Sequence, residues 1–303
     1  MNEQSVIWVL AFWYTLSVSA VLIWLWRTHR GKQAFESAPP RWHLIEITDI
    51  LFLVLLYLVM QSVPLAVLGK EQARRLGLPA LLLVFAGQVV LTTAVMVLAR
   101  RRFAEGLRGF GIRLERFWRN LGVALAGFVL GTGLVLLVLA VITYLIPDEI
   151  PQHELLRELR EQPGSSVSLL IMLTAVVGAS LMEETLFRGI IQTFLAGRIG
   201  GKQEMMPQTS GQADTSAPLE QWSVRRWIGD PSMKARWLAI AVTAALWAAV
   251  HPNWQHMPAL FVLGLLLGYL YERYGNLLVP IAVHALFNLL QVTMTIVQAN
   301  QPQ

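Results

Sequence analysis

Residues 181–189, LMEETLFRG, place two adjacent glutamates and an arginine in a run that otherwise has the composition of a membrane span. Residues 167–182 carry no charged side chain until that point, and a charge at membrane depth costs at least about 2.5–3.5 kcal/mol. Successive helical side chains point about 100° apart, so Glu183 and Glu184 need different partners. Glu184 and Arg188, four residues apart, can pair on one face. The stretch predicts either a structural ion pair beside a second glutamate hydrogen-bonded between helices, or a catalytic carboxylate, Glu183, supported by that pair.

The composition is that of a membrane protein with several spans. Of the 303 residues, 55% are hydrophobic and 14% charged, and the mean hydropathy is +0.53, which is too apolar for a soluble domain of this size. The chain has no cysteine, which excludes disulfides, a thiolate nucleophile and a cysteine-ligated zinc site. The basic residues cluster in loops, so the high isoelectric point indicates membrane topology and not nucleic-acid binding.

Eight apolar runs predict an all-α polytopic membrane protein with about eight transmembrane helices around a polar cavity. Residues 1–164 would hold the first four spans and residues 165–303 a catalytic core with the last four. Between spans five and six, the polar composition of about 197–236 predicts a flexible insert, and a short amphipathic helix is expected near 153–161. The predicted spans are residues 5–26, 49–69, 80–99, 121–146, 167–196, 237–251, 258–271 and 277–297.

The distribution of basic residues predicts the orientation. With the N-terminus outside, the inner loops hold 18 Lys and Arg residues and the outer loops five. Because cytoplasmic loops are enriched in Lys and Arg, this arrangement predicts a multi-pass protein of the cell membrane, with its cavity and active site facing the cytoplasm.

Two histidines and an asparagine join Glu183 within the predicted spans. His251 closes the sixth span, and His284 in the eighth span has Asn288 four residues later on the same face. Counted at about 1.5 Å per residue from the inner ends, the four side chains fall in one layer about 10–21 Å deep, open to the inner side. The alternatives are that His251 caps a helix end and that His284 and Asn288 are interhelical hydrogen-bonding residues.

These residue types allow two mechanisms of amide hydrolysis. In the first, Glu183 is the general base, holds a water with His251, and His284 and Asn288 donate hydrogen bonds to the oxyanion. In the second, Glu183, His251 and His284 bind Zn²⁺, with a water as the fourth ligand. The HExxH signature of soluble metalloproteases is absent from the sequence, and no serine triad is indicated.

Three motifs resemble those of the CAAX prenyl endopeptidase and bacteriocin-processing family of intramembrane proteases, also called the Abi family. They are EExxxR at 183–188, an aromatic residue with a histidine four residues later at 247–251, and HxxxN at 284–288. The resemblance covers roughly residues 165–297. One departure is Trp247, where phenylalanine is commoner in the family, and the other is the long insert.

The resemblance implies an eight-helix fold with a conical cavity open to the cytosol. It also implies that Glu183 and His251 activate water and that His284 and Asn288 form the oxyanion site, with the neighbouring glutamate–arginine pair in support. We therefore expect an intramembrane endopeptidase that acts on a membrane-associated protein or peptide within the lipid bilayer. Trimming after a prenylated cysteine, the activity of eukaryotic members, is not carried over. The alternative is a non-catalytic transporter or scaffold that binds a peptide or lipid in the same cavity.

Overall fold

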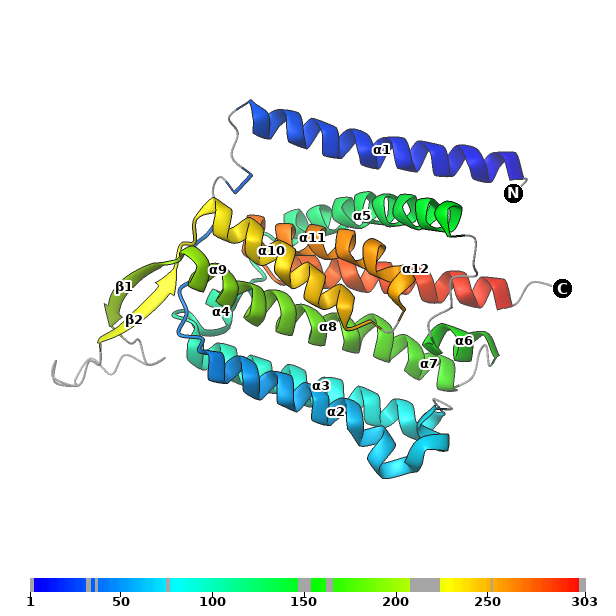
Figure 1. Ribbon diagram of the computed structural model, residues 1–303, viewed down its shortest axis with the longest axis horizontal. Helices are drawn as coiled ribbons and strands as arrows, with labels where there is room; N and C mark the ends of the chain where they lie inside the picture. The colour runs from blue at the N-terminus through cyan, green and yellow to red at the C-terminus, as the bar shows by residue number, and fades with distance from the viewer. Residues whose placement is uncertain are drawn as a thin grey trace.

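The computed structural model is a bundle of long helices that lie roughly side by side (Figure 1). It describes residues 3–30, 34–35, 38–74, 77–146, 154–161, 166–207, 224–251 and 253–299. Seven of the long helices are α1 (Glu3–His29), α2 (Ile47–Arg74), α3 (Leu78–Arg102), α5 (Phe117–Leu145), α10 (Met233–Ala249), α11 (Met257–Tyr274) and α12 (Leu278–Ala299).

The eighth long helix, residues 166–200, is central to the packing, and we call it the central helix. It contacts α3, α10, α11 and α12, so the stretch with the two glutamates is enclosed by other helices. Parts of it are π-helical, a form that recurs at functional sites. Its segments are α7 (Ser166–Met172), η1 (Leu173–Ala179), α8 (Ser180–Glu183), η2 (Glu184–Gln192) and α9 (Thr193–Gly200), with η1 and η2 the π-helical ones.

Each predicted span coincides with one long helix, and the chain is a helical polytopic membrane protein. Among the described residues, five helices are long and apolar enough to cross a membrane, namely α2, α3, α5, the central helix and α12. Helices α10 and α11 have 17 and 18 residues, slightly fewer than the roughly 20 that a span requires. The crossing of the membrane by these two helices and by α1 stays a prediction.

The range interpreted as a flexible insert contains a β-hairpin, a departure from an all-α fold. Strand β1 (Lys202–Pro207) pairs in antiparallel fashion with β2 (Val224–Gly229). The loop before α2 adds to it, because the backbone N–H of His43 donates to Ile228 O at 2.9 Å and Ile228 N–H donates to His43 O at 3.0 Å. Residues 208–223 of the insert lie outside the described residues.

The bundle has two ends of different chemistry (Figure 1). We call one end the basic end, because the loops rich in Lys and Arg lie there. It carries the hairpin, α4 (Gly106–Phe110) and the first residues of α2, α5, α10 and α12. The opposite end carries α6 (Glu154–Glu161), the short 3₁₀ helix η4 (Trp254–His256) and the last residues of α12, and we call it the α6 end. The amphipathic helix predicted near 153–161 is confirmed as α6, and its Leu159 is fully buried.

Candidate active site

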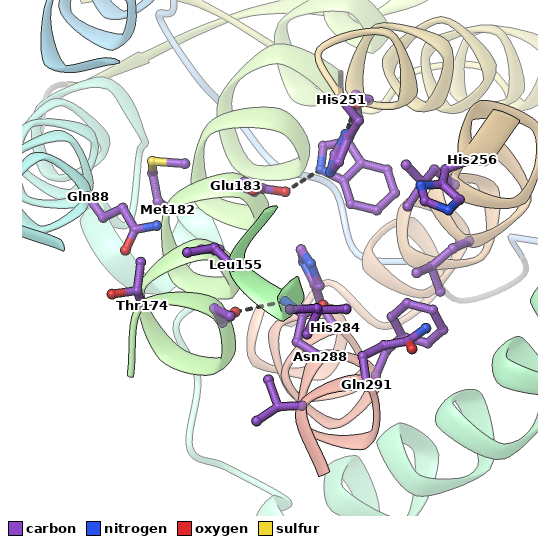
Figure 2. Close-up of a pocket in the computed structure, with 18 of the residues that line it drawn as sticks. Gln88, Leu155, Thr174, Met182, Glu183, His251, His256, His284, Asn288 and Gln291 are labelled. Carbon is purple, nitrogen blue, oxygen red and sulfur yellow. Dashed lines mark hydrogen bonds between the residues drawn. The ribbon is translucent and has the colours of Figure 1, made fainter. Parts of the chain in front are cut away.

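The four residues predicted to act together line one cavity of about 520 Å³. Glu183 comes from α8, His251 follows α10, and His284 and Asn288 come from α12. Figure 2 shows their side chains around the same space. The N-terminal segment, which carries none of the three motifs, also contributes to the cavity wall, and this contribution was not predicted from the sequence. Its wall residues are Tyr57, Met60, Gln61, Val84, Gly87, Gln88, Leu91, Val135 and Leu139.

Glu183 is held by a tryptophan of α10. The indole Nε1–H of Trp247 donates to Glu183 Oε2 at 2.6 Å (Figure 2). The indole is 1% exposed and lies close to Gly264 of α11, where an added Cβ would come within 3.3 Å of its Cε3. From the sequence, Trp247 was identified only as a departure from the phenylalanine that is commoner in the family. The missed signal was its N–H, since a buried indole usually has a hydrogen-bond partner.

The same tryptophan orients His251. His251 Nδ1 lies 2.8 Å from the backbone carbonyl oxygen of Trp247, and the rings meet edge to face with centroids 5.1 Å apart. A carbonyl oxygen can only accept, so Nδ1 carries the hydrogen and Nε2 of the neutral ring keeps its lone pair. His251 can therefore accept a proton or a hydrogen bond at Nε2.

Glu184 lies between two basic groups. The predicted ion pair is present, with Arg188 Nη1 2.9 Å from Glu184 Oε1 and both side chains fully buried. His284 Nδ1 lies 2.9 Å from the same oxygen, a contact not foreseen from the sequence. Arg188 can only donate, so Glu184 Oε1 is an acceptor and Nδ1 of His284 carries the hydrogen of the second contact. Arg188 stacks 4.6 Å over the Trp247 ring, which connects the pair to the Glu183 side.

Asn288 ties α12 to the π-helical part of the central helix. Its Nδ2 donates to the backbone carbonyl of Ala175 at 2.8 Å and lies 3.5 Å from Ser180 Oγ. The shorter bond commits one amide hydrogen to positioning, and an oxyanion role would take the other from its longer hydrogen bond to Ser180 Oγ. The interhelical hydrogen bond expected as the alternative for this residue is present.

The cavity extends from this layer toward the α6 end. Its walls there include Leu155 and Leu156 of α6, His256 of η4 and Gln298 near the end of α12. These wall residues lie toward the α6 end, whereas the sequence predicts an opening on the side of the basic loops; the side of the membrane on which the cavity opens stays a prediction. Depth counting gives the level of each residue along the bundle, but it does not reveal which end the packing leaves open.

The residues considered for zinc do not fit that ion as they are arranged. Among the described residues, no group of three His, Asp or Glu side chains is placed to hold a metal ion. In the set Glu183, His251 and His284, both histidines engage Nδ1 with an oxygen, as metal-ligating histidines also do, so it is the placement of the three side chains and not their hydrogen bonds that does not fit the ion. We therefore derive no step that passes through a metal.

Comparison with known proteins identifies the region that holds the site. Residues 165–290 match the family of type II CAAX prenyl endopeptidases, Rce1-like, and this range contains the three motifs. Comparisons with curated proteins and with solved structures found no match. The match confirms the resemblance drawn from the motifs: residues 165–290 are similar to the Rce1-like family of type II CAAX prenyl endopeptidases, which are proteases.

Proposed function

We propose that this chain is an intramembrane endopeptidase that cleaves a peptide bond of a membrane-associated protein or peptide with water activated by Glu183. The observation that carries the proposal is the set of contacts at Trp247, which holds Glu183 by its N–H and His251 by its carbonyl oxygen on the wall of one cavity. A general base and a nearby proton acceptor are what attack by water requires.

In the proposed reaction, Glu183 takes a proton from a water whose oxygen attacks the scissile carbonyl carbon. The free Oε1 of Glu183 serves as the base, and Nε2 of His251 accepts a hydrogen bond from the same water. The proton passes from Glu183 to the amide nitrogen as the carbon–nitrogen bond breaks. The first products are a carboxylic acid and an amine, and transfer of the acid's proton to the amine gives a carboxylate and an ammonium group, so atoms and charge balance without a further reactant.

The oxyanion of the tetrahedral intermediate is assigned to His284 and Asn288. In this role the ring of His284 carries a hydrogen on each nitrogen: Nδ1–H is held by Glu184 Oε1, and Nε2–H donates into the cavity. The second amide hydrogen of Asn288 would provide the other donor. Losing a single donor of this type usually lowers kcat about 10²–10³-fold.

The remaining parts of the proposal concern location and substrate. We place the enzyme in the cell membrane, with residues 165–303 as its catalytic core and residues 1–164 completing the cavity wall. The name of the matched family does not by itself extend prenyl recognition to this chain, so the substrate stays a membrane-associated polypeptide. A transporter or scaffold would bind in the same cavity without needing a base.

Glu183→Gln is the decisive variant, because it keeps the shape and the acceptor for Trp247 but removes the base. Protein N- and C-termini are compared in membranes of cells that express the wild type, Glu183→Gln or no enzyme. We expect new termini with the wild type alone, and a loss of about 10²–10⁴-fold in cleavage of the substrate so identified. Equal cleavage by a well-expressed Glu183→Gln would overturn the proposal.

A further inference from the structure

We propose that Gln88 of α3 and Thr174 of the central helix form a subsite that binds the main chain of the substrate beside the catalytic residues. Neither residue belongs to the three motifs. The ligand class is the main-chain amide of a polypeptide in extended conformation. The word substrate rests on the proposed function, but the binding of a polypeptide by this subsite needs no catalysis.

Both side chains end in a buried polar group without a partner. Gln88 is 9% exposed and Thr174 is 1% exposed. Among the described residues, neither Gln88 Oε1 nor Thr174 Oγ1 has a hydrogen-bond partner. Both residues line the cavity of about 520 Å³, and Figure 2 shows them on the same side of it. Since buried polar groups in proteins are almost always hydrogen-bonded, we expect a molecule in the cavity to supply the partners.

The hydroxyl of Thr174 differs from those of other helical threonines in the chain. Thr93, Thr143 and Thr295 each donate to the backbone carbonyl oxygen four residues earlier, a common way to satisfy a threonine hydroxyl within a helix. Thr174 lies in the π-helical segment η1, and its hydroxyl has no such bond. The hydroxyl of Thr132 in α5 also lacks a partner among the described residues, but Thr132 is not one of the described wall residues. Of these two hydroxyls, only that of Thr174 lies where a ligand can reach it.

Gly178 makes the room in which the Gln88 side chain lies. An added Cβ at Gly178 would come within 1.9 Å of Gln88 Oε1 and within 2.9 Å of its Cδ, and both distances are too short for a contact between atoms that are not bonded. In Figure 2 the Gln88 side chain points from α3 toward the central helix, with its amide nitrogen on the cavity side. Because the terminal torsion of glutamine is broad, the amide can present either its N–H or its carbonyl oxygen to a ligand.

The subsite lies at a peptide's reach from the proposed base. The cavity follows the central helix, because the wall residues of this helix run from Thr174 to Glu183. Gln88 is level with Gly178, and the five residues from there to Glu183 span about 7–8 Å along the axis. An extended peptide advances about 3.3 Å per residue, so Gln88 meets the main chain roughly two residues from the scissile bond. Thr174, about one turn farther along, meets it roughly two residues beyond that.

A glutamine amide and a hydroxyl suit a peptide main chain. An extended chain in a protein cavity leaves its N–H and C=O groups unpaired unless the protein supplies partners. The Gln88 amide offers a donor and an acceptor, as a peptide group does, and the Thr174 hydroxyl can donate or accept. Their neighbours on the wall include the apolar Val84 and Leu91. The pair is uncharged, so it selects for the main chain and not for an acidic or basic side chain.

The first test measures binding without turnover. The probe is benzoylphenylalanine in place of Gln291, which lies on the cavity wall away from Gln88 (Figure 2), in full-length chains that also carry Glu183→Gln. Light then joins bound polypeptide covalently to the chain in cells. The yield per folded molecule is compared with and without Gln88→Met or Thr174→Val.

Matched controls remove the same groups elsewhere. Gln255→Met acts on a glutamine that is also 9% exposed, and Thr132→Val on a threonine that is also 1% exposed, both outside the described wall. Loss of one hydrogen bond should lower the yield about 3–10-fold in Gln88→Met and in Thr174→Val, and the controls should stay within about 1.5-fold. Unchanged yield in either variant, an equal fall in the controls, or no joined polypeptide at all would overturn the proposal.

Gly178→Ala tests the position of the Gln88 amide from the other helix. It should lower the yield as far as Gln88→Met does, because the new methyl group displaces the amide. In a Gln88→Ala background it should cause no further loss. An undiminished loss in that background would contradict the seating of Gln88 against Gly178.

A substrate identified through Glu183→Gln allows the second test. Synthetic peptides carry an ester in place of the main-chain amide two residues from the cleaved bond, on each side in turn. One of these esters should raise KM about 3–10-fold for the wild type with kcat within about twofold, and it should have no such effect on Gln88→Met. An equal effect on both enzymes would overturn the proposal. Polypeptide joined to the chain in the first test, without cleavage by the wild type, would refute the proposed function and support the subsite.

Discussion

Glu184 and Glu272 are both fully buried, and each lies between two basic side chains, yet their surroundings differ. Glu184 contacts Arg188 and His284 at 2.9 Å each, and His284 lines the cavity of about 520 Å³. One of its two partners is therefore an imidazole ring that faces a space large enough for a peptide segment.

Glu272 lies nearer the basic end and has two arginines as partners. It forms ion pairs with Arg41 and, at 2.8 Å, with Arg236, and it accepts a hydrogen bond from Gln192 at 3.0 Å. The space beside the two arginines is about 10 Å³, roughly the room that one water needs. This cluster ties the loop before α2 to α10 and α11.

The difference shows that a buried glutamate between two cations does not by itself identify an active site. Arginine does not lose its proton in proteins, so the Glu272 cluster has a fixed charge and suits a structural role. Histidine is a side chain that can donate or accept a proton in catalysis, and in the Glu184 cluster the histidine lines a cavity. The titratable partner and the adjacent space are therefore the features that indicate chemistry.

The largest expected effect comes from replacing the buried glutamate by alanine in each of the two clusters. Glu184→Ala and Glu272→Ala each leave buried basic groups unpaired, so each should lower the free energy of unfolding by about 3–5 kcal/mol. Per folded molecule, Glu184→Ala should also lower kcat at least about 100-fold, since His284 loses the carboxylate that holds its Nδ1–H and orients the ring toward the oxyanion. Glu272→Ala should keep kcat within about twofold. Unfolding in detergent and turnover normalised to folded protein measure both.

A control for this pair is Glu105→Ala, which removes the exposed carboxylate 3.6 Å from Arg113. An exposed pair contributes about 0–1 kcal/mol, so both stability and turnover should change little. The distinction between the clusters would fail if Glu272→Ala reduced kcat per folded molecule as much as Glu184→Ala does.

Much of the fold could be predicted because apolar run length sets helix length in a membrane. The site could be predicted in part, because each motif places its polar residue at a definite depth, and the structure does bring Glu183, His251, His284 and Asn288 to one cavity. The direction of the cavity could not be obtained in this way. It depends on which end the side chains of several helices fill, and that is a property of the packed bundle.

Two further features depend on contacts between distant segments. The hairpin is completed by hydrogen bonds between Ile228 and His43, which are separated by more than 180 residues, whereas the local composition of the insert predicted flexibility. The contact of His284 with Glu184 requires the relative rotation of α12 and the central helix. Neither is encoded in the spacing of residues within one segment.

A second prediction concerns how stability depends on pH near the Glu272 cluster, where His43 lines the small space beside Arg41 and Arg236. Burial, helped by the positive charge of Arg41, lowers the pKa of His43 from 6.5 to about 4. Its folded form is therefore neutral, and protonation favours unfolding. The stabilisation is fully present above about pH 6.5 and is lost as the pH falls to about 4, a difference of about 3 kcal/mol. Unfolding at pH 7 and pH 4.5 should show this loss in the wild type and less of it in His43→Gln. An equal loss in both would exclude His43 as the source.

The smallest expected effect concerns the hydrogen bond from Trp247 to Glu183 in the candidate active site. Trp247→Phe keeps an aromatic ring but removes the N–H that donates to Glu183. Because a hydrogen bond to a charged group contributes about 1.5 kcal/mol or more, kcat should fall roughly 10-fold with KM unchanged, since the carboxylate is no longer held in place. Trp237→Phe, on the same helix but in an aromatic stack with Tyr269, should leave kcat within about twofold. In a Glu183→Gln background, Trp247→Phe should cause no further loss, because its effect on rate acts through that carboxylate. A rise in KM at constant kcat would instead make Trp247 part of the substrate-binding wall.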